Sequence, residues 1–253
     1  MKDHKYCYPN SNVLINKLNI RDANELKETE ADITLIRLQY LELRPIVGKF
    51  DFNHLKKIHK YIFQDIYSWA GKVRTVEISK GNSFFCTTRY LQDYATEIFN
   101  AYYKECKATA DNREKFINTL TKHYADLNAL HPFREGNGRT QREFARTLCL
   151  KCGYIFDLSQ TKYKDMLNAS ICSFQTGDNS KLKNIFQTAI IPIMEYTPKE
   201  TTNLKILSID DLKISKSDYN YYEDGNSEAV KKYDAFYKGK IKQLKDKKQS
   251  FTR

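Results

Sequence analysis

The stretch of sequence that decides the fold begins at His131, ends at Arg142 and reads His131-Pro132-Phe133-Arg134-Glu135-Gly136-Asn137-Gly138-Arg139-Thr140-Gln141-Arg142. It places a base, an acid, two glycines and several arginines within one short segment. Gly136 and Gly138 let the backbone approach a ligand closely and turn its amides inward, a geometry that suits phosphate oxygens at a helix N-terminus. The stretch therefore predicts a nucleotide-binding turn between two helices.

Helical patterns flank this turn on both sides. Before it, apolar residues at helical spacing predict an amphipathic helix over residues 114–130, with an apolar face formed by Phe116, Leu120, Tyr124, Leu127 and Leu130. Pro132 forces His131 out of that helix. After the turn, apolar residues at every fourth position predict a second helix that begins near Gly138, with an apolar face formed by Phe144, Leu148 and Cys152.

The charged groups agree with a bound phosphate. Arg139, Arg142 and Arg146 fall in the first turns of the second helix, where the helix dipole disfavours each cation by about 0.3–1 kcal/mol, so an anionic ligand is expected. Glu135 can hold a magnesium ion, which binds through one or two carboxylates plus substrate phosphates. Histidine titrates near neutral pH, so His131 is the natural general base. A basic helix start with a structural histidine explains any one of these residues, but packing does not require the whole set together.

The stretch resembles the signature of the Fic family, HPFx[D/E]GNGRxxR, and every specified position is present. The resemblance continues in residues 8–14, 18–22 and 63–76 and covers roughly residues 6–195. It implies an all-α Fic fold, a helical bundle with a short β-hairpin flap over the active site. It also implies a protein adenylyltransferase that transfers AMP from magnesium-ATP to a hydroxyl side chain of a target protein.

The resemblance assigns roles to individual residues. His131 would deprotonate the target hydroxyl, and Glu135 would coordinate the magnesium that bridges the α- and β-phosphates. Arg139 would hold the departing phosphates, and Arg142 would grip the γ-phosphate. Phe133 is expected to be a core anchor. The complete set of expected nucleotide-binding residues is Lys80, Gly81, Gly136, Asn137, Gly138, Arg139, Gln141 and Arg142.

A second element supports this interpretation. Residues 75–79 and 80–85 form two short extended runs around a turn and predict a hairpin. In the family this hairpin is a flap that adds the target segment as a strand. Ile78 and Phe85 would then press the target residue toward His131. An ordinary surface hairpin is the alternative.

Many Fic proteins carry an inhibitory motif, [S/T]xxxE[G/N], whose glutamate pairs with the second arginine of the signature. None of the glutamates fits this motif: Glu30, for example, has Leu26 at the Ser/Thr position, and Glu200 has Tyr196. The resemblance then implies the subclass inhibited in trans, in which a small antitoxin supplies the glutamate to Arg142. The chain would be the toxin of a toxin–antitoxin pair.

Composition and charge set the outer limits. Sparse Gly and Pro and recurring 3.6-residue apolar patterns predict a mostly helical core in residues 1–200, followed by a polar extension, 201–253. The net charge of +11 does not indicate nucleic-acid binding, because residues 231–253 hold nine Lys or Arg against two Asp, a balance of +7. This basic tail is a solvated segment, a polyanion-binding arm or part of a secretion signal. The predicted helices span residues 22–43, 53–65, 89–107, 114–130, 138–152, 160–175 and 179–190.

The cysteines and hydropathy predict a cytoplasmic protein. Six cysteines without a signal peptide or a run of 18 apolar residues indicate reduced thiols and no membrane segment. The CxxC of Cys149 and Cys152 lies on a predicted helix and more often serves packing than metal or redox chemistry. His54, His59 and His123 are expected to be structural.

Several functions stay open at this level. The chain could be a secreted effector that modifies host proteins, a Fic-like enzyme with another phosphate-containing donor, or a non-catalytic binding module. Gyrase or topoisomerase subunits are the expected targets of a bacterial toxin, and small GTPases those of a host-directed effector. The mass added to a target separates AMP transfer from transfer of another phosphate-containing group and from a module that transfers nothing.

Overall fold

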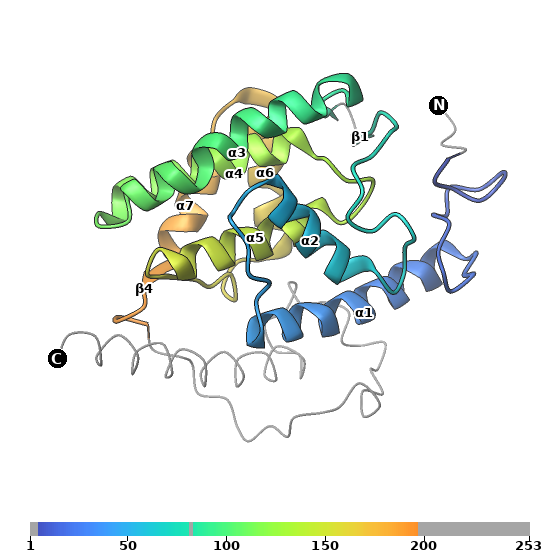
Figure 1. Cartoon of the computed structure of the whole chain (residues 1–253), viewed down its shortest axis with the longest axis horizontal. Helices are drawn as coiled ribbons and strands as arrows, with labels where there is room; N and C mark the ends of the chain where they lie inside the picture. The colour runs from blue at the N-terminus through green and yellow to red at the C-terminus, as the bar shows by residue number, and fades with distance from the viewer. Residues whose placement is uncertain (1–4, 81–82, 197–253) are drawn as a thin grey trace, which may run out of the picture.

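The computed structural model describes residues 5–80 and 83–196, and within these ranges the chain is mostly helical (Figure 1). Its helices are α1 (Ala23–Leu43), α2 (Phe52–Phe63), α3 (Leu91–Ala108), α4 (Arg113–Leu130), α5 (Asn137–Lys151), α6 (Tyr163–Thr176) and α7 (Ser180–Ala189). A short 3-10 helix, Thr88–Tyr90, precedes α3. The helix boundaries predicted from sequence agree with these to within three residues, so the predicted fold class is confirmed.

Short polar side chains begin several of these helices. The carboxylate of Asp22 accepts hydrogen bonds from the backbone amides of Asn24 and Glu25 at the start of α1. Asp51 and Asn112 cap α2 and α4 in the same way. Each cap satisfies an amide that has no partner inside the helix, which stabilises the helix by about 1 kcal/mol.

Helix α5 packs against both α2 and α4, and α3 lies beside α4 (Figure 1). The predicted apolar face of α4 is confirmed, because its five residues are at most 1% exposed: Phe116, Leu120, Tyr124, Leu127 and Leu130. On α5, Phe144 and Leu148 are fully buried, whereas Cys152 is only partly buried. The two helices that flank the signature stretch are therefore held by one continuous core.

The strands are short and antiparallel. The predicted hairpin is present as β1 (Ser79–Lys80) and β2 (Ser83–Phe84), with Ser79 opposite Phe84. A second sheet pairs β3 (Tyr154–Phe156) with β4 (Ile190–Pro192). Sequence patterns did not indicate this second sheet, because both strands are only three residues long and follow directly on helices.

Some predictions fall outside the residues that the structure describes. These are Gly81 in the hairpin, the domain boundary expected after residue 200, and the polar extension with its basic tail.

Candidate active site

The signature stretch forms the turn between α4 and α5. Helix α4 ends at Leu130. The next residue, His131, caps the helix with a φ of 44°, in the left-handed region, and Pro132 follows. The predicted exit of His131 from the helix is therefore confirmed. Helix α5 begins directly after Gly136, whose φ is 79°.

The His131 side chain is oriented by a backbone carbonyl and an aromatic ring. Its Nδ1 lies 3.0 Å from the carbonyl oxygen of Asn128. A carbonyl only accepts hydrogen bonds, so Nδ1 carries the proton and the neutral ring keeps a lone pair on Nε2. The ring of Phe85 stacks on the imidazole, with centroids 3.7 Å apart, and is itself in contact with Phe174 of α6. This arrangement suits a general base whose active nitrogen is Nε2.

Asn137 holds the turn closed. Its side-chain amide donates to the carbonyl of Phe133 at 2.8 Å, and its side-chain oxygen accepts from the Phe133 amide at 2.9 Å. Phe133 is 1% exposed, so its predicted role as a core anchor is confirmed. Because the Asn137 side chain is buried and bonded to the turn, the backbone amide is the group of this residue that faces a ligand at the helix start.

The glycine at the start of α5 is required by space as well as by φ. A Cβ on Gly136 would lie 2.1 Å from Cζ of Phe63, an approach that side chains do not tolerate. The first backbone hydrogen bond of the helix runs from the Thr140 amide to the Gly136 carbonyl. The amides of Asn137, Gly138 and the next residue therefore precede the helical hydrogen-bond pattern and form an anion-binding helix start.

His59 supports the same turn from α2. The Gly71 amide donates to its Nδ1 at 2.8 Å, so Nε2 carries the proton and donates to the Glu135 carbonyl at 3.0 Å. Burial lowers the pKa of His59 to about 3, which keeps the ring neutral. His54 and His123 are also buried against protein partners, so the structural interpretation of all three histidines is confirmed.

The side chain of Glu135 extends away from the core and is about half exposed. Its Oε1 accepts from the Gly136 amide at 2.8 Å and lies 3.8 Å from Nη2 of Arg139. One exposed carboxylate beside an anion-binding helix start fits magnesium, which takes one or two carboxylates and completes its shell with phosphates and water. Among the described residues there is no cluster of three or more His, Cys, Asp or Glu that could hold a metal without such a ligand.

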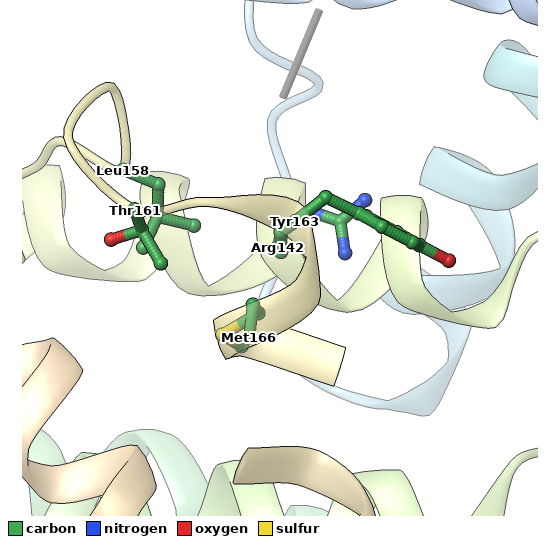
Figure 2. Close-up of a pocket in the computed structure, with 5 residues that line it drawn as sticks. All are labelled: Arg142, Leu158, Thr161, Tyr163 and Met166. Carbon is green, nitrogen blue, oxygen red and sulfur yellow. The ribbon is translucent and has the colours of Figure 1, made fainter. Parts of the chain in front are cut away.

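Three arginines follow in α5, and they have different surroundings. Arg139 pairs with Glu30 and donates to the Thr34 hydroxyl at 3.0 Å. Arg142 lines a pocket at the surface of α5, together with residues of α6 and the segment before it (Figure 2): Leu158, Thr161, Tyr163 and Met166. Gln141 is 2% exposed, and its side-chain amide donates to the Leu127 carbonyl at 3.1 Å, away from this pocket. That placement favours a supporting role for Gln141 rather than direct contact with a nucleotide.

The expectation that Arg146 binds an anionic ligand is wrong. Arg146 is 4% exposed and pairs with Glu42 at 2.6 Å and with Glu143 at 2.7 Å. It also donates to the Leu41 carbonyl at 3.1 Å. Glu143 lies three residues earlier on the same helix, whereas Glu42 belongs to α1, so the charge spacing along α5 alone does not reveal Glu42.

Arg74 links the hairpin to the turn between α4 and α5. Its Nε donates to the His131 carbonyl at 2.9 Å, and its backbone amide donates to the Pro132 carbonyl at 2.9 Å. Its two remaining nitrogens donate to the carbonyls of Val76 and Cys86, one on each side of the hairpin. The side chain is fully buried. Sequence reasoning passed over Arg74, because an isolated arginine before a strand gives no signal of long-range partners.

The hairpin brings part of the expected flap to His131. The ring of Phe85 stacks on the imidazole ring, and the backbone amide of Phe85 donates a hydrogen bond to the Ile78 carbonyl at 3.4 Å. Ile78 is partly buried on the opposite side of the hairpin. Lys80 is described only by its backbone, as the last residue of β1.

Comparison with known proteins agrees with this geometry. The profile of the Fic/DOC family matches residues 49–149. A probable protein adenylyltransferase y4lH of Sinorhizobium fredii is 39% identical over 177 residues, which are 70% of this chain and 90% of that protein. The chain belongs to the Fic/DOC family.

Two further relatives extend the comparison. The protein adenylyltransferase VbhT of Bartonella schoenbuchensis is 40% identical over 67% of this chain, but the chain spans only 35% of the length of VbhT. The N-terminal Fic domain of a VirB-translocated effector from Bartonella quintana, solved with bound ADP, superposes with a TM-score of 0.69 at 28% identity, over 75% of this chain and 95% of that one. The Fic fold of this chain is thus shown by sequence and by structure.

Across residues 5–80 and 83–196, no helix combines the length and the apolar character needed to cross a bilayer.

Proposed function

We propose that this Fic protein is a protein adenylyltransferase that moves AMP from magnesium-ATP to a hydroxyl side chain of a target protein. The observation that carries the proposal is the His131 imidazole, whose Nδ1 is held by the Asn128 carbonyl beside the anion-binding start of α5. Its curated relatives are named protein adenylyltransferases, which supports a nucleotidyltransferase enzyme. The ADP bound to the Bartonella quintana domain supports a nucleotide co-substrate.

The chemistry follows from the placement of these groups. The target hydroxyl oxygen attacks the α-phosphorus, the bond from that phosphorus to pyrophosphate breaks, and the hydroxyl proton passes to Nε2 of His131. The backbone amides after Gly136 hold phosphate oxygens without reorganising. Arg139 and Arg142 place positive charge for the departing phosphates. Glu135 would hold the magnesium ion, which neutralises phosphate charge when bound.

The hairpin is the proposed docking element for the target. β2 leads directly to Phe85, so a target strand added to the hairpin would present its side chain next to His131. Ile78 and Phe85 would clamp that side chain, and Lys80 with Gly81 would contact the nucleotide. Backbone pairing makes this recognition tolerant of target sequence, while the two apolar side chains restrict its geometry.

The test is incubation of the purified chain with α-labelled ATP, magnesium and bacterial lysate, beside a His131→Ala variant checked for its fold by circular dichroism. Label on a discrete band that the variant does not produce would support AMP transfer and deliver the target. No label with folded wild-type protein, also after addition of eukaryotic lysate, would refute the proposal.

We further propose that an inhibitory glutamate reaches Arg142 from a separate small antitoxin, because no glutamate of the chain carries the inhibitory motif. Purified alone, the chain should transfer AMP without an activating substitution. The product of a small neighbouring gene should suppress this activity. Inactivity of the isolated chain, or unchanged activity with that product, would contradict a toxin–antitoxin pair.

The proposal also covers the bounds of the catalytic domain and the cell in which the protein acts. Residues 1–200 form the catalytic domain, and 201–253 are an extension that transfer does not need. Action on gyrase or topoisomerase in the producing cell suits a toxin, and the effector relative from Bartonella quintana makes delivery into another cell the alternative. A chain truncated after residue 200 should retain AMP transfer, and its loss would reassign the boundary.

A further inference from the structure

One glutamate of α1 is bound to the active-site arginine rather than to solvent. Glu30 lies at the middle of α1 and is 9% exposed, and its Oε1 accepts from Nη2 of Arg139. The inhibitory motif of the family would place a glutamate on Arg142, so the partner found here is a different one. Figure 1 shows α1 running along the same side of the molecule as α2, which explains how α1 reaches the start of α5.

Glu30 is itself fixed by a second buried group. The Tyr67 hydroxyl donates to Oε2 of Glu30, so both carboxylate oxygens are engaged. Burial, and then the Glu30 charge, raises the pKa of Tyr67 well above its ordinary value, so the hydroxyl keeps its proton and remains a donor. The carboxylate thus has one position, set from the segment that follows α2.

Two more contacts complete the cradle around the guanidinium. Thr34 lies one turn after Glu30 in α1, donates its hydroxyl to the Ala31 carbonyl at 3.2 Å, and accepts from Nη1 of Arg139 at 3.0 Å. The ring of Phe63 lies under the guanidinium, 4.7 Å from its central carbon. Arginine has five N–H groups, and the bonds to Glu30 and Thr34 use two of them.

The guanidinium also lies 3.8 Å from the Glu135 carboxylate, and the side chain stays partly exposed, so an anion could approach it. The Arg139 side chain is 21% exposed, and burial opposes its charge while Glu30 and Glu135 raise its pKa. An arginine at the start of a helix is disfavoured by the helix dipole, and the Glu30 carboxylate offsets that repulsion. Without the Glu30 carboxylate, the Arg139 side chain would populate several rotamers, and phosphate binding would have to order the side chain.

We propose that Glu30 is a positioning residue, which, together with Tyr67 and Thr34, holds Arg139 ready for the pyrophosphate portion of the nucleotide. The proposal rests on the proposed function for the role of Arg139. Glu30 itself touches no reacting atom and acts only through the arginine. Preorganisation of this kind favours the transition state, since the arginine needs no rearrangement when charge moves to the leaving group.

The test is a double-mutant cycle read out by equilibrium binding of magnesium pyrophosphate and of magnesium-ATP. Four proteins are compared: wild type, Glu30→Gln, Arg139→Ala and the double variant, with Glu25→Gln on the exposed face of α1 as the matched control. Glu30→Gln should weaken pyrophosphate binding about fivefold to tenfold in the wild-type background and less than twofold beside Arg139→Ala. Glu25→Gln should change it less than twofold.

The result that overturns the proposal is equal weakening in both backgrounds, or no weakening in the first. Should Glu30→Gln fail to fold, Tyr67→Phe removes only the hydroxyl that fixes the carboxylate, and the same cycle is run with it. Where AMP transfer is measurable, Glu30→Gln should lower kcat about tenfold and raise the KM for ATP less than threefold. Binding is measured without transfer, so failure of the proposed function and failure of this proposal are separate outcomes.

Discussion

Gly136→Ala is the substitution whose cost the structure defines most sharply. The left-handed φ of 79° costs an alanine about 1–2 kcal/mol, of which about 0.4–1 kcal/mol is recovered because alanine restricts the unfolded chain. The new Cβ would also lie 2.1 Å from the ring of Phe63, which is fully buried and cannot move aside. Overpacking of this kind adds about 1–3 kcal/mol.

Gly177 supplies the matched control. It caps the end of α6 with a φ of 74°, and a Cβ there would meet nothing within 4 Å. Gly177→Ala therefore carries the backbone strain without the clash. We expect Gly136→Ala to lower the free energy of unfolding by about 1–3 kcal/mol more than Gly177→Ala does, which corresponds to several degrees in Tm.

Urea denaturation followed by far-ultraviolet circular dichroism measures both variants. Equal losses of stability would refute the reasoning, because they would mean that the space beside Phe63 is not limiting. A second cycle tests the contact directly: Phe63→Leu combined with Gly136→Ala should cost less than the sum of the two single changes. Gly136→Ala should also weaken binding of magnesium-ATP, since the displaced residue precedes the amides of the helix start.

Three further predictions concern buried polar groups. The pKa of His59 is about 3 in the folded protein, so between pH 6.5 and pH 3 the histidine binds a proton only in the unfolded chain. The free energy of unfolding should therefore fall with pH in this range by about 1.4 kcal/mol per pH unit more than in His59→Gln, and equal slopes in urea titrations would contradict this. Arg146→Met should lower the free energy of unfolding by about 3–5 kcal/mol in urea denaturation, because it leaves the buried carboxylates of Glu42 and Glu143 unpaired. The triple variant, in which both glutamates are also replaced by Gln, should lose less stability, and the reverse order would argue against the ion pairs. Asn137→Ala should lower stability by about 2–4 kcal/mol in the same assay, because two hydrogen bonds to the turn are lost, and a loss under 0.5 kcal/mol would exclude a bracing role.

The sequence predicted those features that depend on neighbouring residues. The apolar spacing of α4 located its buried face, and Pro132 located its end, because both effects act within a few residues of the chain. The two glycines located the turn for the same reason. The order of chemical groups in residues 131–142 then indicated the nucleotide site.

Features that depend on distant partners were not predicted. Arg146 and Arg139 each pair with one carboxylate of α1, about a hundred positions earlier, and local charge spacing cannot reveal these two partners. Their other carboxylate partners, Glu143 and Glu135, lie three and four residues before them in the sequence. The pairing of β3 with β4 joins two three-residue segments that have no room for a period-2 pattern. His59 was correctly taken as structural, but its bond to the Glu135 carbonyl could not be read from an apolar helix face.

Because Arg74 anchors the hairpin mainly through backbone carbonyls, the attachment of the hairpin depends little on which side chains the hairpin carries. The Arg74 guanidinium donates to the backbone carbonyls of Val76, Cys86 and His131. The Glu77 carboxylate, 3.6 Å away, is a side-chain partner in the hairpin segment. Side chains in the hairpin can therefore be exchanged without removing any of the carbonyl acceptors. Under the proposed function, new target preferences could be engineered, or could arise by mutation, in a hairpin that stays attached to the backbone of His131.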